Sequence, residues 1–414
     1  MVRNKCEHNY VNYFGEYQEC DYEAWEHSKN NYCILHAINN NKPKELFNNK
    51  LREKIENGKN KDLDFTDMYF CDLSAFKNRE INKRVIFERC YFTNKCIFEG
   101  TVFNEIVDFS NAESPKGSIT FKKVVFKRDC DFSSINFLQI YLSNVKFIGR
   151  ANFKNSKIKM LDITDCGKTI FMSLADFSNT KFRFKVNFSD SIFEEEVRFY
   201  NTEFYDKVNF DRAVFKNLPK FSGAKFNEIT CEKTVFKNKI AQEILCRKAR
   251  LFCEKNDDRD KADYYFKLEK RAKRKQLGPK LDINNPSFNW YKNLNWGDWK
   301  GWFELLKRFF EWFFVDLTTA YGTSWNRILI WWVIVILIPA ILYSVNDAVL
   351  INLKSVSINF FQGLYFSIIT FATLGYGDMI PKNGWPQVVA SVESILGAIL
   401  MAAFIAVFSR KFMR

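Results

Sequence analysis

The sequence predicts a multidomain membrane protein, in which a large soluble region precedes a small helical membrane domain. Two long apolar segments, residues 328–345 and 385–409, lie near the C-terminus. The mean hydropathy of the whole chain is nevertheless −0.28, which is too polar for a chain embedded mostly in lipid. Phenylalanine, present 44 times, recurs at short regular intervals before these segments. We therefore expect a repetitive soluble part followed by a membrane part.

Residues 1–50 contain all three histidines of the chain, interleaved with cysteines. Two residues separate Cys33 from His36, and this spacing lets both side chains bind one tetrahedral metal ion. Cys6 and Cys20 would complete a Cys3His zinc site, which would stabilise a segment too small to fold by core burial alone. Because the spacing of Cys6 and Cys20 is irregular, unliganded thiols are the alternative.

Residues 62–238 form the repetitive part. Phenylalanines recur there at intervals of five and six residues, and the clearest run is Phe188, Phe193, Phe199, Phe204, Phe210, Phe215, Phe221 and Phe226. A small or β-branched residue stands two positions before many repeat centres, as Ala151, Ala175, Ser191 and Thr202 do. One large and one small inward side chain on each short face become buried when successive turns of the chain stack.

This five-residue pattern resembles the pentapeptide-repeat family. The resemblance implies a right-handed quadrilateral β-helix, in which the six-residue intervals are single-residue bulges at the corners. About 177 residues at roughly 20 to 22 per turn would give about eight turns. A β-sandwich rich in phenylalanine is the alternative, and the phase of the small residues argues against it. Most remaining cysteines occupy small repeat positions, as expected for reduced core thiols in the cytosol.

The charge of the repeats bears on their partners. The chain has a net charge of +14, but basic and acidic residues nearly balance within residues 62–238. We therefore expect no nucleic-acid partner for this region. A rigid spacer, a dimerisation surface and a docking platform for an unidentified protein or ligand stay open as roles.

Two helical elements are expected between the repeats and the membrane. Residues 239–278 follow a 3.6-residue apolar period that is interrupted once, which predicts a helical hairpin. Its basic run, residues 270–275, is expected either to contact anionic lipid headgroups or to be a solvated face. Residues 298–320 have one aromatic and aliphatic face and one charged face, which predicts an amphipathic helix lying along the inner leaflet.

The two apolar segments predict transmembrane helices. Residues 328–345 are uncharged, and at ~1.5 Å per residue they approach the roughly 30 Å of the hydrocarbon core. Residues 385–409 are longer and contain one acid. Between them, the apolar stretch that begins residues 358–378 is too short to span, which suits a re-entrant helix. Two packed core helices joined by a glycine turn are the alternative.

The loop after this short helix reads Thr373, Leu374, Gly375, Tyr376 and Gly377, followed by Asp378. Glycines at alternate positions permit dihedral angles that a side chain resists, so that successive carbonyls can face one axis. Stacked carbonyl rings of this kind replace the water shell of an ion. The loop therefore predicts an ion-selectivity filter.

The order of helix, short helix, TLGYGD and helix is similar to that of the two-transmembrane potassium channels. This resemblance covers residues 328–414 and implies a homotetramer, because four loops close one filter, with K⁺ ions bound in it. It also implies selectivity for potassium over sodium, which Tyr376 supports. The chain departs from the family at Phe366, where many relatives have a tryptophan that braces the filter, and at Ile369, where some have a glutamate. Tyr365 is the candidate substitute, and we expect a less braced outer filter.

Two residues of the second span are further candidates. Glu393 is an acid within a membrane segment, which predicts either a cavity charge that attracts cations or a hydrogen-bond partner behind the short helix. Gly397 loosens the helix, and both a gating hinge and close helix packing account for it.

The charged flanks predict orientation. Basic residues precede the first span and follow the second, so both termini are expected in the cytoplasm of a two-span cell-membrane protein. Residues 1–14 lack the apolar run of a signal peptide. The sequence shows no acid, base or nucleophile constellation, so we do not expect an enzyme. We expect a potassium channel, possessing an N-terminal cytosolic domain through which gating force enters. A poorly selective cation channel and a membrane-tethered scaffold with a vestigial pore are the alternatives.

Overall fold

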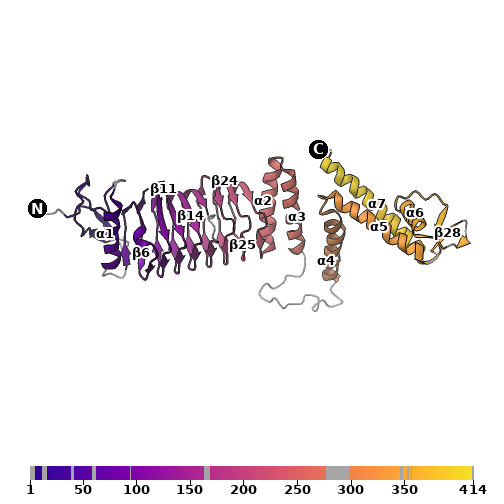
Figure 1. Cartoon of the computed structure of the whole chain (residues 1–414), viewed down its shortest axis with the longest axis horizontal. Helices are drawn as coiled ribbons and strands as arrows, with labels where there is room; N and C mark the ends of the chain where they lie inside the picture. Colours follow the sequence, from indigo (N-terminus) through magenta and orange to yellow (C-terminus); the bar gives the residue numbers. More distant parts are fainter. Residues whose placement is uncertain are drawn as a thin grey trace. The chain divides into compact units, whose positions relative to one another are not determined.

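The computed structural model describes residues 5–11, 16–38, 42–57, 62–93, 95–162, 168–276, 299–345, 348–351, 354–355 and 357–412. The chain forms two compact units, Met1–Tyr265 and Phe266–Arg414. The first contains a long β-helix, and the second contains the apolar helices (Figure 1).

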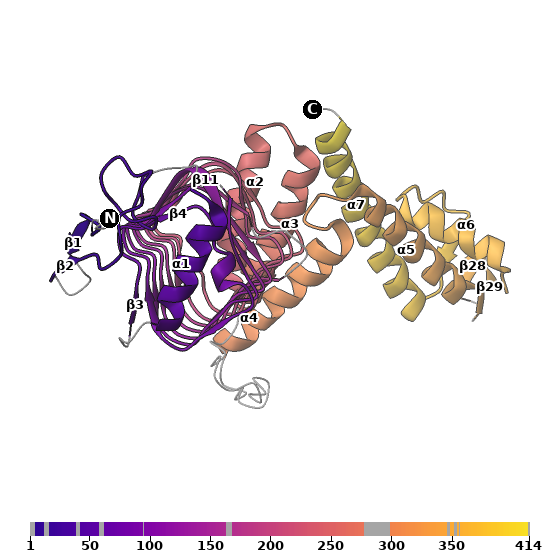
Figure 2. The same ribbon diagram turned by 60° about the vertical axis from the view of Figure 1, so that its left-hand side comes forward.

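The first unit begins with a small hairpin and a helix. Strands β1 (Asn9–Val11) and β2 (Tyr17–Glu19) pair antiparallel. Helix α1 (Lys44–Asn57) lies across the N-terminal end of the β-helix (Figure 2), where it buries Phe47 and Leu51 completely. A 3₁₀ turn, η1 (Ser74–Phe76), follows within the first turn of the β-helix. The helix therefore covers apolar side chains that a neighbouring turn would otherwise bury.

The β-helix consists of short parallel strands in three sheets. One sheet contains β3 (Asp62–Asp64), β6 (Arg84–Ile86), β10 (Val107–Asp108), β13 (Cys130–Asp131), β16 (Ala151–Asn152), β19 (Ala175–Asp176) and β23 (Val197–Arg198). Another contains β5 (Glu80–Ile81), β9 (Val102–Phe103), β12 (Val125–Phe126), β15 (Lys146–Phe147), β18 (Ile170–Phe171), β22 (Ile192–Phe193), β25 (Val214–Phe215) and β27 (Val235–Phe236).

The third sheet bends around a corner and supplies the other two faces. It contains β4 (Tyr69–Phe70), β7 (Tyr91–Phe92), β8 (Lys95–Glu99), β11 (Glu113–Lys122), β14 (Asn136–Ser143), β17 (Lys157–Asp162), β20 (Lys181–Phe182), β21 (Val186–Asn187), β24 (Glu203–Asn209) and β26 (Lys225–Thr230). Both β7 and β8 pair with successive parts of β11. The predicted β-helix of about eight turns is thereby confirmed, over residues 62–236.

Stacked phenylalanines fill the core of the β-helix. In one column, the ring centroids of Phe109, Phe132 and Phe153 follow one another at 4.7 and 4.8 Å, with planes within 6° of parallel. These separations match the ~4.8 Å between neighbouring strands, so each ring lies on the ring of the previous turn. A second column runs from Phe103 to Phe236.

The corners and the small positions have their own roles. A residue two positions after the first column's phenylalanine has a left-handed backbone, as Asn111, Asn155 and Asn201 do, with φ of 57°, 58° and 51°. Asparagine tolerates this region better than most residues with a side chain. At the small positions, hydroxyl groups donate to a phenylalanine carbonyl of the previous turn, for example from Thr202 to Phe177 at 2.7 Å. The small residues therefore also join the turns.

Helices α2 (Lys239–Lys255) and α3 (Arg259–Gln276) follow the last strand. Asn238 caps α2, because its side chain accepts hydrogen bonds from two backbone amides of the first turn. Within the first unit, the Tyr265 hydroxyl accepts a hydrogen bond from the backbone amide of Cys231 at 3.2 Å.

The second unit contains α4 (Trp299–Phe310), the π-helical segment η3 (Glu311–Leu317), α5 (Trp325–Val345), α6 (Phe360–Phe371) and α7 (Trp385–Phe412). The strands β28 (Val349–Ile351), β29 (Lys354–Ser355) and β30 (Met379–Pro381) form a small antiparallel sheet. Two segments, Trp325–Val345 and Trp385–Lys411, are long and apolar enough to cross a membrane. Their apolar side chains are mostly not buried within the chain, as expected for helices that face lipid or other subunits.

Candidate functional site

The short helix α6 is fixed at both ends. At its start, the side chain of Asn359 accepts from the amide of Gln362, and the Gln362 side chain accepts from the amide of Asn359, which completes a capping box. At its end, the amides of Thr373 and Leu374 donate to carbonyls of the last helical turn at 3.0 and 2.9 Å. The C-terminal end of α6, which carries the partial negative charge of the helix dipole, therefore leads directly into the predicted filter loop.

The loop itself has an alternating backbone. Thr373, Gly375 and Gly377 have φ of 54°, 55° and 80°, whereas the residues between them do not have positive φ. A Cβ atom added to either glycine would meet no atom within 4 Å, so the backbone conformation, and not crowding within the chain, requires glycine. All six residues 373–378 are exposed in the single chain. The two glycines of the loop thus face open space within the described part of their own chain.

Two contacts hold the end of this loop. The Tyr365 hydroxyl donates to Asp378 Oδ2 at 2.8 Å. Directly after Asp378, strand β30 pairs with β28, in register Met379 with Ile351. The sequence indicated the tyrosine, but it did not indicate this strand, because three-residue strands carry almost no periodic signal.

The two positions that depart from the resembled channels lie in an apolar cluster. Phe366 and Ile369 are 3% and 4% exposed and pack with Tyr343 and Met379. The rings of Phe366 and Tyr343 meet edge to face at an interplanar angle of 68°, with centroids 4.8 Å apart. Phe366 therefore joins α6 to α5 through apolar contact.

Glu393 joins three helices. Its carboxylate is buried, with the residue 2% exposed, and it accepts hydrogen bonds from Tyr343 of α5, at 2.9 Å, and from Ser367 of α6. The Ser367 hydroxyl also lies 2.7 Å from the Ile336 carbonyl oxygen. Of the two expected roles, this geometry supports the hydrogen-bond partner behind the short helix and not a charge facing an open cavity.

Two glycines bring the helices into close contact. A Cβ atom at Gly397 of α7 would lie 2.2 Å from the carbonyl oxygen of Phe371, the last residue of α6. A Cβ atom at Gly363 of α6 would lie 2.6 Å from the carbonyl oxygen of Ala340 in α5. Close packing therefore accounts for a glycine at position 397, since no larger residue fits without moving the backbone.

Within the basic run of α3, the two arginines form ion pairs, whereas two of the lysines are exposed. Arg271 and Arg274 pair with Asp316 of η3 at 2.7 and 2.9 Å, and Asp316 is 5% exposed. Lys273 and Lys275 are exposed. Burial favours a higher pKa for Asp316, but the hydrogen bonds and charges of the two arginines more than offset it and lower the pKa. No local pattern indicated this pairing, because the partners are more than forty residues apart in the chain.

The four predicted zinc ligands come together in the structure. Cys6, Cys20, Cys33 and His36 are all buried, and their ligand atoms lie within 4.8 Å of one another. The structure brings this group together in the first unit, separate from the predicted filter residues, which belong to the second.

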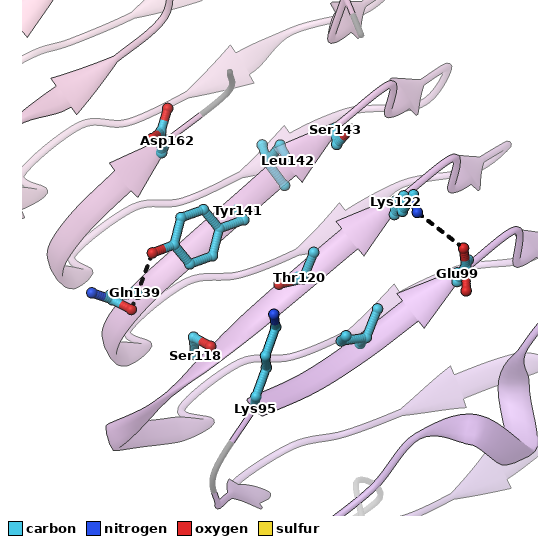
Figure 3. Close-up of a pocket in the computed structure, with 11 residues that line it drawn as sticks. Lys95, Glu99, Ser118, Thr120, Lys122, Gln139, Tyr141, Leu142, Ser143 and Asp162 are labelled. Atoms are coloured by element: carbon cyan, nitrogen blue, oxygen red, sulfur yellow. Dashed lines mark hydrogen bonds and ion pairs between the residues drawn. The ribbon is translucent and has the colours of Figure 1, made fainter. Parts of the chain in front are cut away.

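A groove lies on the outer face of the third sheet, over β8, β11, β14 and β17 (Figure 3). Lys122 pairs with Glu99 at 3.2 Å, and the Tyr141 hydroxyl donates to Gln139 at 3.2 Å. These four side chains thus pair with one another within the β-helix.

The comparisons with known families agree with this architecture. Residues 331–414 match the family described as "Ion channel", and residues 87–136 match the family described as "Pentapeptide repeats (9 copies)". The search of curated proteins and the search of solved structures found no match. The chain therefore carries a two-transmembrane ion-channel domain after a pentapeptide-repeat β-helix.

Proposed function

We propose that four copies of this chain form a potassium-selective channel that conducts K⁺ passively through the Thr373–Gly377 filter. The observation that carries the proposal is the exposed loop 373–378, with left-handed Gly375 and Gly377, at the C-terminal end of α6. Carbonyl rings need several copies of such a loop around one axis. The ion-channel match supports a membrane protein with two spans that acts as a multimer.

Ion flux through the purified protein in liposomes tests this function. We expect K⁺ flux and a reversal potential in mixed K⁺ and Na⁺ that follows the potassium gradient. Gly375→Ala should abolish flux, because alanine resists a φ of 55°. Gly384→Ala is the matched control, since Gly384 also has positive φ, 105°, and free space around it but lies outside the filter.

The same experiment separates the two alternatives. A reversal potential near zero in equal concentrations of K⁺ and Na⁺ on opposite sides would indicate a poorly selective cation channel. No flux in the wild-type chain, with the protein folded and inserted, would indicate a scaffold with a vestigial pore. Equal losses in Gly375→Ala and Gly384→Ala would remove the argument that the loop conducts.

We further propose that gating force enters from the N-terminal, cytoplasmic side through the segment before α5. Three consecutive residues there, Ala320 to Gly322, have φ of 50°, 59° and 74°. Such strained turns cluster at switch regions. The Tyr321 hydroxyl accepts from Arg274 at 3.2 Å and donates to Glu311 at 3.0 Å, and Arg327 of α5 donates to the carbonyl of Asp316 at 3.2 Å.

This segment also supports a position at the inner membrane surface. Large apolar side chains are exposed on α4 and η3, namely Phe303, Leu306, Phe309, Phe310, Trp312, Phe314 and Val315. Lys307 and Arg308 lie in the last turn of α4. An amphipathic helix with these groups would bury its apolar side chains in lipid and keep its cations near the headgroups. Both termini would then be cytoplasmic.

A further inference from the structure

The cysteines and histidine of the N-terminal segment come from three separate pieces of chain. Cys6 and Cys20 flank the β1–β2 hairpin, and the amide of Cys20 donates to the carbonyl of His8 at 3.3 Å. Cys33 and His36 belong to one tight turn, in which the His36 amide donates to the Cys33 carbonyl at 3.1 Å. The hairpin and the turn thus place four metal-binding side chains around one point.

The spacing of the ligand atoms is close to that of a tetrahedral site, with all of them within 4.8 Å of one another. The sulfur atoms of Cys20 and Cys33 are 3.7 Å apart, and Cys33 Sγ is 3.2 Å from His36 Nδ1. A tetrahedron with Zn–S of about 2.3 Å and Zn–N of about 2.0 Å has S···S edges of about 3.8 Å and S···N edges of about 3.5 Å, so the sulfur pair matches and the histidine nitrogen lies about 0.3 Å closer to Cys33 than in an ideal site. A disulfide would require about 2.05 Å between the sulfurs, so the cysteines are free thiols.

The surroundings of the site suit a metal thiolate better than neutral thiols. The backbone amide of Cys33 points at Cys6 Sγ, at 3.0 Å, and amide donors of this kind stabilise ligating sulfur. Coordination through Nδ1 leaves Nε2 of His36, which is buried and has no hydrogen-bond partner among the described residues, free to carry the proton. The His8 ring stacks on His36 at 4.3 Å.

The segment also needs a crosslink. Apart from the three cysteines, the buried apolar residues in its described part, 5–11 and 16–38, are Ile34, Leu35 and Ala37. Three such side chains give too little burial to order a segment of this length. A closed four-ligand zinc site supplies this stabilisation directly.

The Cys33–His36 turn contacts the first turn of the β-helix. The Leu35 carbonyl, within the Cys33–His36 turn, accepts from the amide of Tyr69 in β4 at 3.0 Å. Lys42 is 5% exposed and donates to the Leu35 carbonyl at 3.3 Å and to the Tyr69 carbonyl at 2.8 Å. These hydrogen bonds tie the Cys33–His36 turn to the first turn of the β-helix. The positive charge of Lys42 would also balance the net negative charge of a zinc ion with three thiolates.

We propose that Cys6, Cys20, Cys33 and His36 bind one zinc ion, which holds the N-terminal segment as a cap on the first turn of the β-helix. Uncapped strand edges invite pairing with other chains, and solenoids require capping elements at their ends. The metal is structural, because four protein ligands fill its coordination sphere and leave no open position.

Metal analysis of the full-length chain, purified in detergent under reducing conditions without chelators, tests this proposal. We expect one zinc ion per chain, and near zero in Cys20→Ser. Cys130→Ser is the matched control, because Cys130 is an equally buried thiol of the β-helix, 1% exposed, and its variant should keep the zinc.

Cobalt substitution in the wild-type chain keeps the test independent of how Cys20→Ser folds. We expect the visible bands of tetrahedral Co²⁺ together with thiolate-to-cobalt charge transfer. Folded wild-type protein with no zinc and no tetrahedral cobalt spectrum would overturn the proposal. Equal loss of zinc in Cys20→Ser and Cys130→Ser would overturn it as well.

Discussion

Replacing Gly397 by alanine separates close packing from a hinge. The added Cβ atom would lie 2.2 Å from the Phe371 carbonyl oxygen, whereas ordinary contacts begin near 3.4 Å. The backbones of α6 and α7 must therefore separate by about 1.2 Å at this point. The obstacle is a backbone atom at the end of the helix that leads into the filter, so it cannot rotate away as a flexible side chain would.

The size of the effect follows from two opposing contributions. Overpacking costs about 1 to 3 kcal/mol, and a backbone obstacle places Gly397→Ala near the upper end. Alanine gains up to ~1 kcal/mol over glycine in helix propensity. The overpacking cost exceeds the gain in helix propensity. We therefore expect the free energy of unfolding to fall by about 2 kcal/mol per subunit, together with reduced K⁺ flux.

Denaturant unfolding of the detergent-solubilised protein and flux in liposomes measure these effects. Ala402→Gly, at an exposed position of α7, is the control that reports helix propensity without packing. We expect it to cost at most ~1 kcal/mol and to leave flux nearly unchanged. A Gly397→Ala protein at least as stable as the wild type would refute the packing argument. Unchanged stability with altered open probability would support a hinge instead.

Four further variants test other contacts. Glu393→Gln replaces one acceptor oxygen by an amide that cannot accept, and should cost about 1 to 3 kcal/mol in unfolding experiments; no change would contradict its role. Tyr365→Phe removes the donor to Asp378 and should shorten single-channel openings at low external potassium, which unaltered recordings would disprove. Asp316→Asn should cost about 2 kcal/mol at neutral pH, because it weakens charged hydrogen bonds to two arginines, one of which is partly exposed. Because the pKa of Asp316 is lowered in the folded chain, its stabilisation is present above about pH 4 and lost below, and the variant should lack this acid dependence. Phe132→Ala should lower the free energy of unfolding by about 3 to 5 kcal/mol. A loss no larger than that of an alanine substitution at an exposed position of the β-helix would argue against the stacked column.

The repeats show how far a local pattern can predict a fold. A phenylalanine and a small residue at fixed spacing specify which side chains face inward, and the structure confirms the stacked turns. The pattern did not reveal that the small hydroxyl residues bond to the previous turn, as Thr202 does with Phe177. A small side chain satisfies the steric requirement whether or not it carries a hydroxyl, so composition alone leaves this open.

In the membrane domain, too, short stretches of sequence predicted the local features. The spans follow from length and hydropathy, and the left-handed backbone at Gly375 and Gly377 follows from glycine at alternate positions, since both properties belong to a short stretch of chain. Tyr365 lies near enough in the chain to Asp378 for their contact to be anticipated.

Contacts between distant helices were decided by the tertiary structure. The sequence left Glu393 between a cavity charge and a hydrogen-bond partner, and only the packing of α5, α6 and α7 around it brought Tyr343 and Ser367 to its carboxylate. Likewise, Asp316 forms ion pairs with two arginines of α3, and no local pattern in the sequence indicated these partners. Periodicity tells which face of a helix is apolar, whereas the partner of a polar side chain depends on which faces meet and at what height along the helices.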